Sequence, residues 1–115
     1  MLSKCEKRIL TDESFFQAIN SHGQFISVSF IAEWSAVCRL FEITLEEVIK
    51  EHDVKFSAFK MDIDDNSKTT QTYAIHELPT TLLFKSGELV EKIAGLISTK
   101  EFLSLVQTHF QTPKT

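Results

Sequence analysis

Cysteine, proline and glycine are scarce in this 115-residue chain, which contains two, two and three of them. Two cysteines, Cys5 and Cys38, cannot form a framework of several disulfides. The fold must therefore rest on a hydrophobic core, and ten phenylalanines supply bulky material for it. The length suits one domain with a core of its own. We predict a single domain over residues 1–110 and a flexible C-terminal tail over residues 111–115.

Clusters of one charge and long apolar runs are also missing. The net charge is only −4, and no group of lysines and arginines forms a basic stripe, so nucleic acid is not expected as a partner. Residues 1–10 carry charges throughout and lack the apolar core of a signal peptide. No apolar run is long enough to span a membrane. These absences predict a cytoplasmic protein with no membrane partner.

A metal site is not indicated either. Asp62, Asp64 and Asn66 have the spacing of a calcium loop, but Ser67 and Tyr73 stand where that loop needs glycine and glutamate. The four histidines are scattered without ligand spacing. The sequence therefore predicts no metal and no cofactor.

Periodicity and capping signals divide the chain into alternating helices and strands. Ile26, Val28 and Phe30 alternate with serines, which predicts a buried central strand. Ser98 with Glu101 forms a capping box that starts the last helix. The predicted order is helix 11–22, strand 25–32, helix 38–52, strand 54–63, a short helix 64–74, strands 80–84 and 88–94 around a two-residue hairpin turn at 86–87, and helix 98–110, with a leading strand near residues 7–10.

This order predicts an α/β fold. Strands that alternate with helices pair in parallel, whereas the hairpin pairs in antiparallel fashion. The expected architecture is a central mixed sheet of four to five strands, with helices on both faces. No internal repeat or linker indicates a second domain.

Several short motifs, in this order, resemble those of the thioredoxin family. Trp34–Cys38 reads Trp-Ser-Ala-Val-Cys, where thioredoxins have Trp-Cys-Gly-Pro-Cys. Leu78–Thr80 resembles the cis-proline loop of the family. Lys60–Asp64 resembles the end of the strand after the motif, Leu83–Glu88 its hairpin, and Gly95 the glycine beside its substrate groove. The resemblance covers residues 7–110 and implies the thioredoxin fold with a cis peptide bond at Pro79.

The resemblance also implies a groove for an extended peptide of a protein partner. Its matching residues are Trp34, Ala36, Val37, Leu78, Pro79 and Gly95. In the family, the first motif cysteine is the nucleophile and the second resolves the mixed disulfide. Here Ser35 occupies the nucleophile position, and Cys38 occupies the resolving position. A serine hydroxyl cannot replace a thiolate unless a base activates it.

Other positions depart from the family pattern in the same direction. Ser29 stands where the family has a buried acid, and Ile43 stands where it has a helix proline. Ser35 is well placed to cap the following helix. Cys38 lies three residues before Phe41 on the same apolar stripe, so it is either a reactive thiol or a small buried hydrophobe.

Three hypotheses follow. The first is a non-catalytic binding module that keeps the groove for a chaperone-like or regulatory role. The second is a single-thiol redox protein in which Cys38 forms mixed disulfides. The third is that Ser35 is an engineered replacement of cysteine, which would make the natural protein an active thiol–disulfide oxidoreductase. The sequence leaves the partner, the oligomeric state and the role of Cys5 open.

Overall fold

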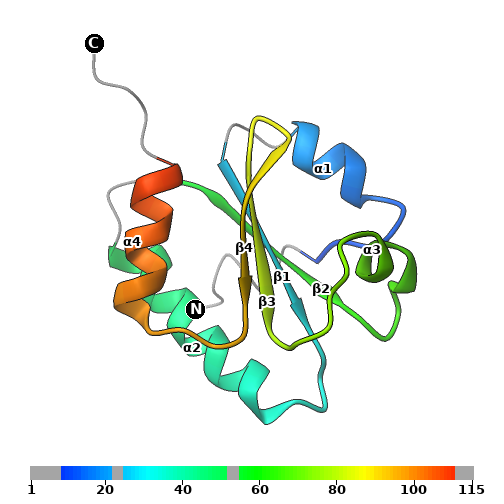
Figure 1. Cartoon of the computed structure of the whole chain (residues 1–115), viewed down its shortest axis with the longest axis horizontal. Helices are drawn as coiled ribbons and strands as arrows, with labels where there is room; N and C mark the ends of the chain where they lie inside the picture. The colour runs from blue at the N-terminus through cyan, green and yellow to red at the C-terminus, as the bar shows by residue number, and fades with distance from the viewer. Residues whose placement is uncertain (1–8, 22–24, 52–54, 111–115) are drawn as a thin grey trace.

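The computed structural model of the chain describes residues 9–21, 25–51 and 55–110, and Figure 1 shows their arrangement. The elements are α1 (Phe15–Ser21), β1 (Phe25–Ile31), α2 (Ala36–Glu51), β2 (Ser57–Asp62), α3 (Ser67–Thr72), β3 (Thr80–Lys85), β4 (Glu88–Ala94) and α4 (Thr99–His109). The four strands form one sheet in the order β2-β1-β3-β4. β1 and β2 are parallel, and the other two pairs are antiparallel. The predicted mixed sheet with helices on both faces is confirmed.

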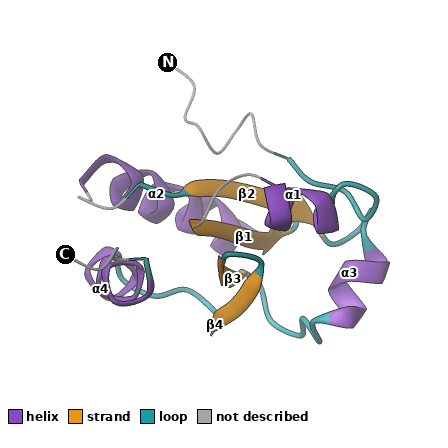
Figure 2. Cartoon of the chain, turned by 90° about the horizontal axis from the view of Figure 1, so that it is seen from above, coloured by secondary structure: helices purple, strands orange, loops and turns teal. Residues whose placement is uncertain are grey.

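Two hydrophobic clusters lie on opposite faces of the sheet. Ile26, Val28 and Phe30 of β1 pack with α1 on one face. On the other face, Phe41 of α2 stacks on Phe102 of α4, with ring centroids 5.9 Å apart. Figure 2 shows α1 and α3 separated from α2 and α4 in this way. β1 is buried on both faces, which explains why it reads as almost continuously apolar.

The N-terminal helix begins later than predicted, at Phe15 instead of Thr11. The hydroxyl of Thr11, at the predicted start of the helix, accepts a hydrogen bond from the Ser14 amide at 3.3 Å and holds a turn before the helix. The Asp12 carboxylate, one residue after the predicted helix start, accepts hydrogen bonds from the amide and hydroxyl of Thr69, at 2.9 and 2.6 Å. It therefore supports α3, which lies more than fifty residues away along the chain.

Several boundaries also differ from the predictions. α2 begins two residues earlier than position 38, and β2 is shorter at both ends than strand 54–63. α3 begins at Ser67, because the segment before it forms a turn in which the Asp64 amide donates to the Asp62 carboxylate. The predicted leading strand is reduced to a single bridge between Ile9 and Lys60 in its described part. Residues 7 and 8, Cys5 and the predicted tail 111–115 lie outside the described residues.

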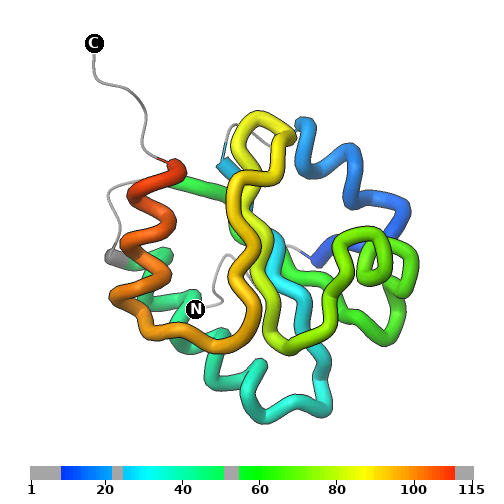
Figure 3. The backbone as a smooth tube through the Cα atoms, in the orientation of Figure 1, coloured from blue at the N-terminus to red at the C-terminus, as the bar shows by residue number. Residues whose placement is uncertain are grey.

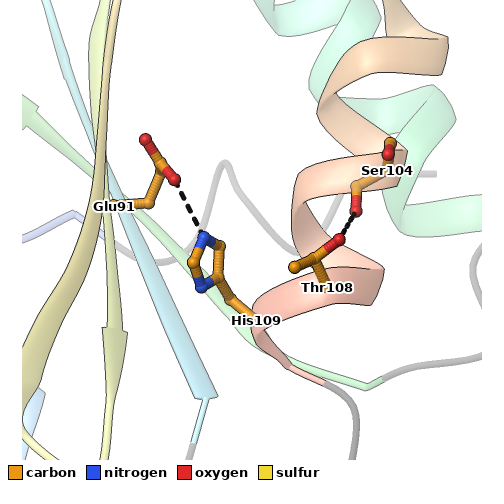
Figure 4. A network of polar contacts seen from close by, with 4 residues as sticks. All are labelled: Glu91, Ser104, Thr108 and His109. Carbon is orange, nitrogen blue, oxygen red and sulfur yellow. Dashed lines mark hydrogen bonds and ion pairs between the residues drawn. The ribbon is translucent and has the colours of Figure 1, made fainter.

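α4 is held at both ends. Ser98 and Glu101 form the predicted capping box at its start. Near its end, Nε2 of His109 lies 2.8 Å from Oε1 of Glu91 on β4 (Figure 4). Within the described ranges, no helix is long and apolar enough to cross a membrane.

Candidate functional site

The sheet register brings three chain segments to one end of the sheet. Phe30 pairs with Thr80, and Thr80 pairs with Ala94. The segment after β1, the segment before β3 and the segment after β4 therefore start from adjacent positions, as the tube in Figure 3 shows. These segments carry all the residues that the sequence assigned to a groove. We call this set the candidate binding surface: Trp34, Ala36, Val37, Leu78, Pro79 and Gly95.

Ser35 acts as a helix cap in this structure. Its hydroxyl oxygen accepts a hydrogen bond from the Cys38 amide at 3.3 Å, and its carbonyl accepts one from the Arg39 amide at 3.4 Å. Both bonds satisfy donors of the first turn of α2 that would otherwise lack a partner. None of its recorded contacts with other described residues is with a base. The geometry therefore supports a structural role for the hydroxyl and gives it no means of activation.

Cys38 is buried, with 2% of its surface exposed. It makes no disulfide and lies on the face of α2 that packs against the sheet. The two residues before it point outward, and Val37 is 42% exposed. The start of α2 therefore presents apolar side chains to solvent and keeps its one thiol inside.

The position of the expected buried acid is occupied by a hydroxyl pair. Oγ of Ser29 lies 3.1 Å from Oγ1 of Thr81, and both residues are almost completely buried. Neither hydroxyl titrates near neutral pH. This position therefore supplies no carboxylate that could accept or donate a proton below the motif. Ser27, two residues earlier on the same strand face, is buried with a hydroxyl that has no hydrogen-bond partner among the described residues.

The opposite side of the candidate binding surface is held by the backbone. The Leu78–Pro79 peptide bond is cis, and the Gly95 amide donates to the Pro79 carbonyl at 2.7 Å. Gly95 has a φ of +90°, and a Cβ there would lie 2.6 Å from a carboxylate oxygen of Glu77. Leu78 is half-buried, and neither its N–H nor its carbonyl is hydrogen-bonded to another described residue. These two backbone groups are available for a β-type interaction.

Trp34 is 68% exposed and is oriented by a residue that the sequence analysis did not assign to the site. Its indole N–H donates to Oδ2 of Asp64 at 2.9 Å. Leu40 and Leu96, which are 55% and 43% exposed, also extend the apolar surface and were missed. A sequence signal existed for both leucines. Leu40 follows Val37 by three residues on a helix, and Leu96 directly follows Gly95.

Metal-binding geometry is not found near this surface. Among the residues that the structure describes, no group of three or more histidine, cysteine, aspartate or glutamate side chains could hold a metal ion. The groups with shifted pKa values also lie away from this surface. A hydrogen bond from the Thr69 side chain lowers the pKa of Asp12, and burial raises the pKa of Tyr73.

Comparisons with known proteins give a consistent result. The family model described as Thioredoxin matches residues 6–108. A thioredoxin of Buchnera aphidicola subsp. Acyrthosiphon pisum is 35% identical over 97 residues, covering 82% of this chain and 90% of that protein. A thioredoxin of Rickettsia bellii is 36% identical over 87 residues, covering 76% of this chain and 83% of that protein. A solved structure, a mutant thioredoxin from Halobacterium salinarum, superposes with a TM-score of 0.81 over 93% of both chains at 22% identity, which shows the shared fold.

Proposed function

Because this chain belongs to the thioredoxin family, we propose that it binds an extended segment of a protein partner without running dithiol–disulfide exchange. Its role would be chaperone-like or regulatory. The observation that carries this proposal is the state of the motif: the hydroxyl of Ser35 caps α2, and the thiol of Cys38 is buried.

The proposed loss of exchange follows from the requirements of the reaction. A protein disulfide is opened by a thiolate that can reach one of its sulfurs in line with the bond that breaks. Ser35 offers no thiolate, and the 2% exposure of Cys38 leaves too little surface for a protein disulfide to approach. The hydroxyl pair of Ser29 and Thr81 supplies no buried acid to assist proton transfer.

The proposed binding uses the features that remain. Trp34 and Val37 offer exposed apolar area, and contact with it removes that area from water. The N–H and carbonyl of Leu78, which are not hydrogen-bonded to any other described residue, can pair with the backbone of an extended segment. Backbone pairing selects for extended conformation, whereas the apolar side chains select for apolar residues in the partner.

The test uses reduced and carboxymethylated ribonuclease A, an unfolded chain without tryptophan or free thiols. Trp34 is the only tryptophan of this protein, so its emission reports binding at the surface directly. We expect saturable binding that Leu78→Glu weakens by about tenfold or more, because a charge would be buried at the contact. Leu89→Glu, at an exposed position of β4 near the hairpin, is the matched control. Equal binding by both variants and the wild-type protein would contradict the proposal.

A second measurement separates binding from catalysis. Dithiothreitol-driven reduction of insulin is followed with wild-type protein and with Cys38→Ala. We expect both to match the rate with dithiothreitol alone. Acceleration by the wild-type protein alone would instead favour the single-thiol redox hypothesis.

A further inference from the structure

α2 carries an apolar stripe on the side that faces away from the sheet. Phe41 and Leu45 of this helix are buried in the core. Leu40 and Ile43 lie on the opposite side of the helix and are 55% and 60% exposed. Ala36, which is also exposed, precedes Leu40 by one turn. We call Ala36, Leu40 and Ile43 the outer stripe of α2.

The outer stripe is large enough to take part in association. A helix face with apolar residues at this spacing is normally buried against another element. With Val37 at its border, the stripe leaves on the order of 300 Å² of apolar surface in water, which is the scale of patch that marks an interaction site. The exposed fractions of these side chains show that no other described segment covers the stripe.

Charges beside the outer stripe are arranged so that one copy of the chain complements another. Arg39 and Glu46 are seven residues apart, which places them on the same flank of the helix, two turns from each other. The Arg39 guanidinium donates one N–H to the Glu33 carbonyl at 3.1 Å, which leaves most of its five N–H groups for other acceptors. The Glu46 carboxylate makes no recorded hydrogen bond or ion pair with another described residue. Each helix therefore offers one cation and one open anion on a single flank.

An antiparallel pair of α2 helices matches the stripe and the charges at once. When a two-fold axis relates two copies, a residue before the axis in one copy meets a residue after it in the other. An axis between Leu40 and Ile43 brings Leu40 of each copy onto Ile43 of the other. The same axis brings Arg39 of each copy beside Glu46 of the other. In a parallel pair, Arg39 and Glu46 would lie about 10 Å apart along the helices, so the charges favour the antiparallel arrangement.

We propose that the outer stripe of α2 is a dimerisation surface, on which the α2 helix of a second copy of this chain packs in antiparallel orientation. The proposal goes beyond the proposed function and does not rest on it. Leu40 and Ile43 form the apolar centre, and two pairs of Arg39 with Glu46 lie at its edge. Two such helix faces with their flanking polar residues bury on the order of 1,000 Å² in total, at the low end for specific interfaces. The dimer is therefore weak and reversible, with a Kd on the order of 100 µM.

The test is sedimentation equilibrium of the full chain from about 10 µM to about 1 mM, under reducing conditions that prevent disulfides through Cys5. We expect the average mass to rise with concentration from that of a monomer toward that of a dimer. Ile43→Glu should weaken the dimer by about tenfold or more, because it buries two charges near the two-fold axis. Phe16→Glu, at a 75% exposed position of α1, is the matched control and should leave the dimer unchanged. Leu78→Glu should also leave it unchanged, which separates the dimer from binding at the candidate binding surface.

Exchanging the charges tests the antiparallel register. Arg39→Glu and Glu46→Arg should each weaken the dimer by about fivefold or more, since each places like charges across the interface. The double variant Arg39→Glu/Glu46→Arg should recover most of the wild-type affinity, because opposite charges then meet again between the copies. Residues seven apart on one helix are not neighbours, so this recovery reports a contact between copies.

Three results would overturn the proposal. One is a mass that stays monomeric up to about 1 mM, which would leave the outer stripe to a different protein. Another is the same dimer affinity for Ile43→Glu and Phe16→Glu, which would show that association does not use the outer stripe. The third is a double charge variant that dimerises as weakly as the single ones, which would exclude the antiparallel register.

Discussion

The two sides of the candidate binding surface have different relations to the thioredoxin family. On the motif side, the residues depart from the family pattern: Ser35 caps α2 and Cys38 is buried. On the other side, the backbone keeps its shape through the cis bond at Pro79 and the hydrogen bond from Gly95. Under the proposed function, the shape of such a surface and its reactivity are separable. Shape depends on many backbone contacts, whereas reactivity depends on one exposed sulfur.

The largest expected effect comes from restoring that sulfur. Ser35→Cys places two thiols three residues apart at the start of α2, where the helix N-terminus stabilises a thiolate. We expect the rate of dithiothreitol-driven insulin reduction to rise by roughly two orders of magnitude above that with the wild-type protein. The reason is that a thiol loses its proton to give the nucleophile far more easily than a serine hydroxyl does. The double variant with Cys38→Ala is the control. No gain for Ser35→Cys would mean that the rest of the motif side has also lost its function.

The next effect tests the backbone side. Gly95→Ala places a Cβ at φ +90° and close to Glu77, so we expect a loss of about 1–2 kcal/mol in the free energy of unfolding. Gly87→Ala, in the hairpin turn, is the matched control, since its φ is +82° and a Cβ there would meet Asn20 of α1. Both variants should lose stability in urea unfolding, but only Gly95→Ala should weaken binding of the unfolded ribonuclease chain. Equal binding by the two variants would show that Gly95 does not contribute to binding at the candidate binding surface.

Two buried serines on β1 test how much a buried hydroxyl contributes to stability with and without a hydrogen-bond partner. Ser29→Ala leaves the Thr81 hydroxyl without its partner, so we expect a loss of about 1 kcal/mol. Ser27→Ala removes a buried hydroxyl that has no partner in the described part of the chain, so we expect a gain of up to about 1 kcal/mol. Urea unfolding of both variants measures the difference. If Ser27→Ala lost as much stability as Ser29→Ala, the hydrogen bond between Ser29 and Thr81 would not explain the effect of Ser29→Ala.

A smaller effect is expected where Asp64 orients Trp34. Asp64→Ala removes an exposed hydrogen bond worth about 0.5–1 kcal/mol, so binding of the unfolded chain should weaken by less than about fivefold. Asp65→Ala, at the next residue, is the control for the loss of one negative charge. Stronger binding after Asp64→Ala would indicate that the hydrogen bond restrains the indole from its binding position.

The smallest effect lies far from both sides, at Asp12. Hydrogen bonding lowers its pKa in the folded protein below the ordinary value of 3.8. Its contribution to stability is therefore complete above the unfolded pKa and is lost as the pH falls through the folded pKa. We expect the Tm of the wild-type protein to fall more than that of Asp12→Asn between pH 5 and pH 3. Parallel curves for the two proteins would contradict this assignment.

The features predicted correctly depend on residues that are close in sequence. The capping box from Ser98 to Glu101 spans four residues, and the turn at residues 86–87 needs only two positions with positive φ. The alternation along β1 is likewise local, which is why the central strand could be predicted. The helix starts at Phe15 and Ser67 were misplaced. The Asp12 side chain bonds to Thr69 of α3 instead of to the nearby helix, and the segment before Ser67 forms a turn closed by Asp62.

The sequence by itself determined that the nucleophile position holds serine, that the strands and helices alternate, and that apolar residues flank the motif. Those properties follow from residue identity and short-range periodicity. Only the tertiary structure decided that Trp34 donates to Asp64, thirty residues away, and that the Cys38 side chain is buried. Contacts of this kind depend on how the helices pack on the sheet. No local pattern records that packing, because the packing free energy is shared among many residues from distant parts of the chain.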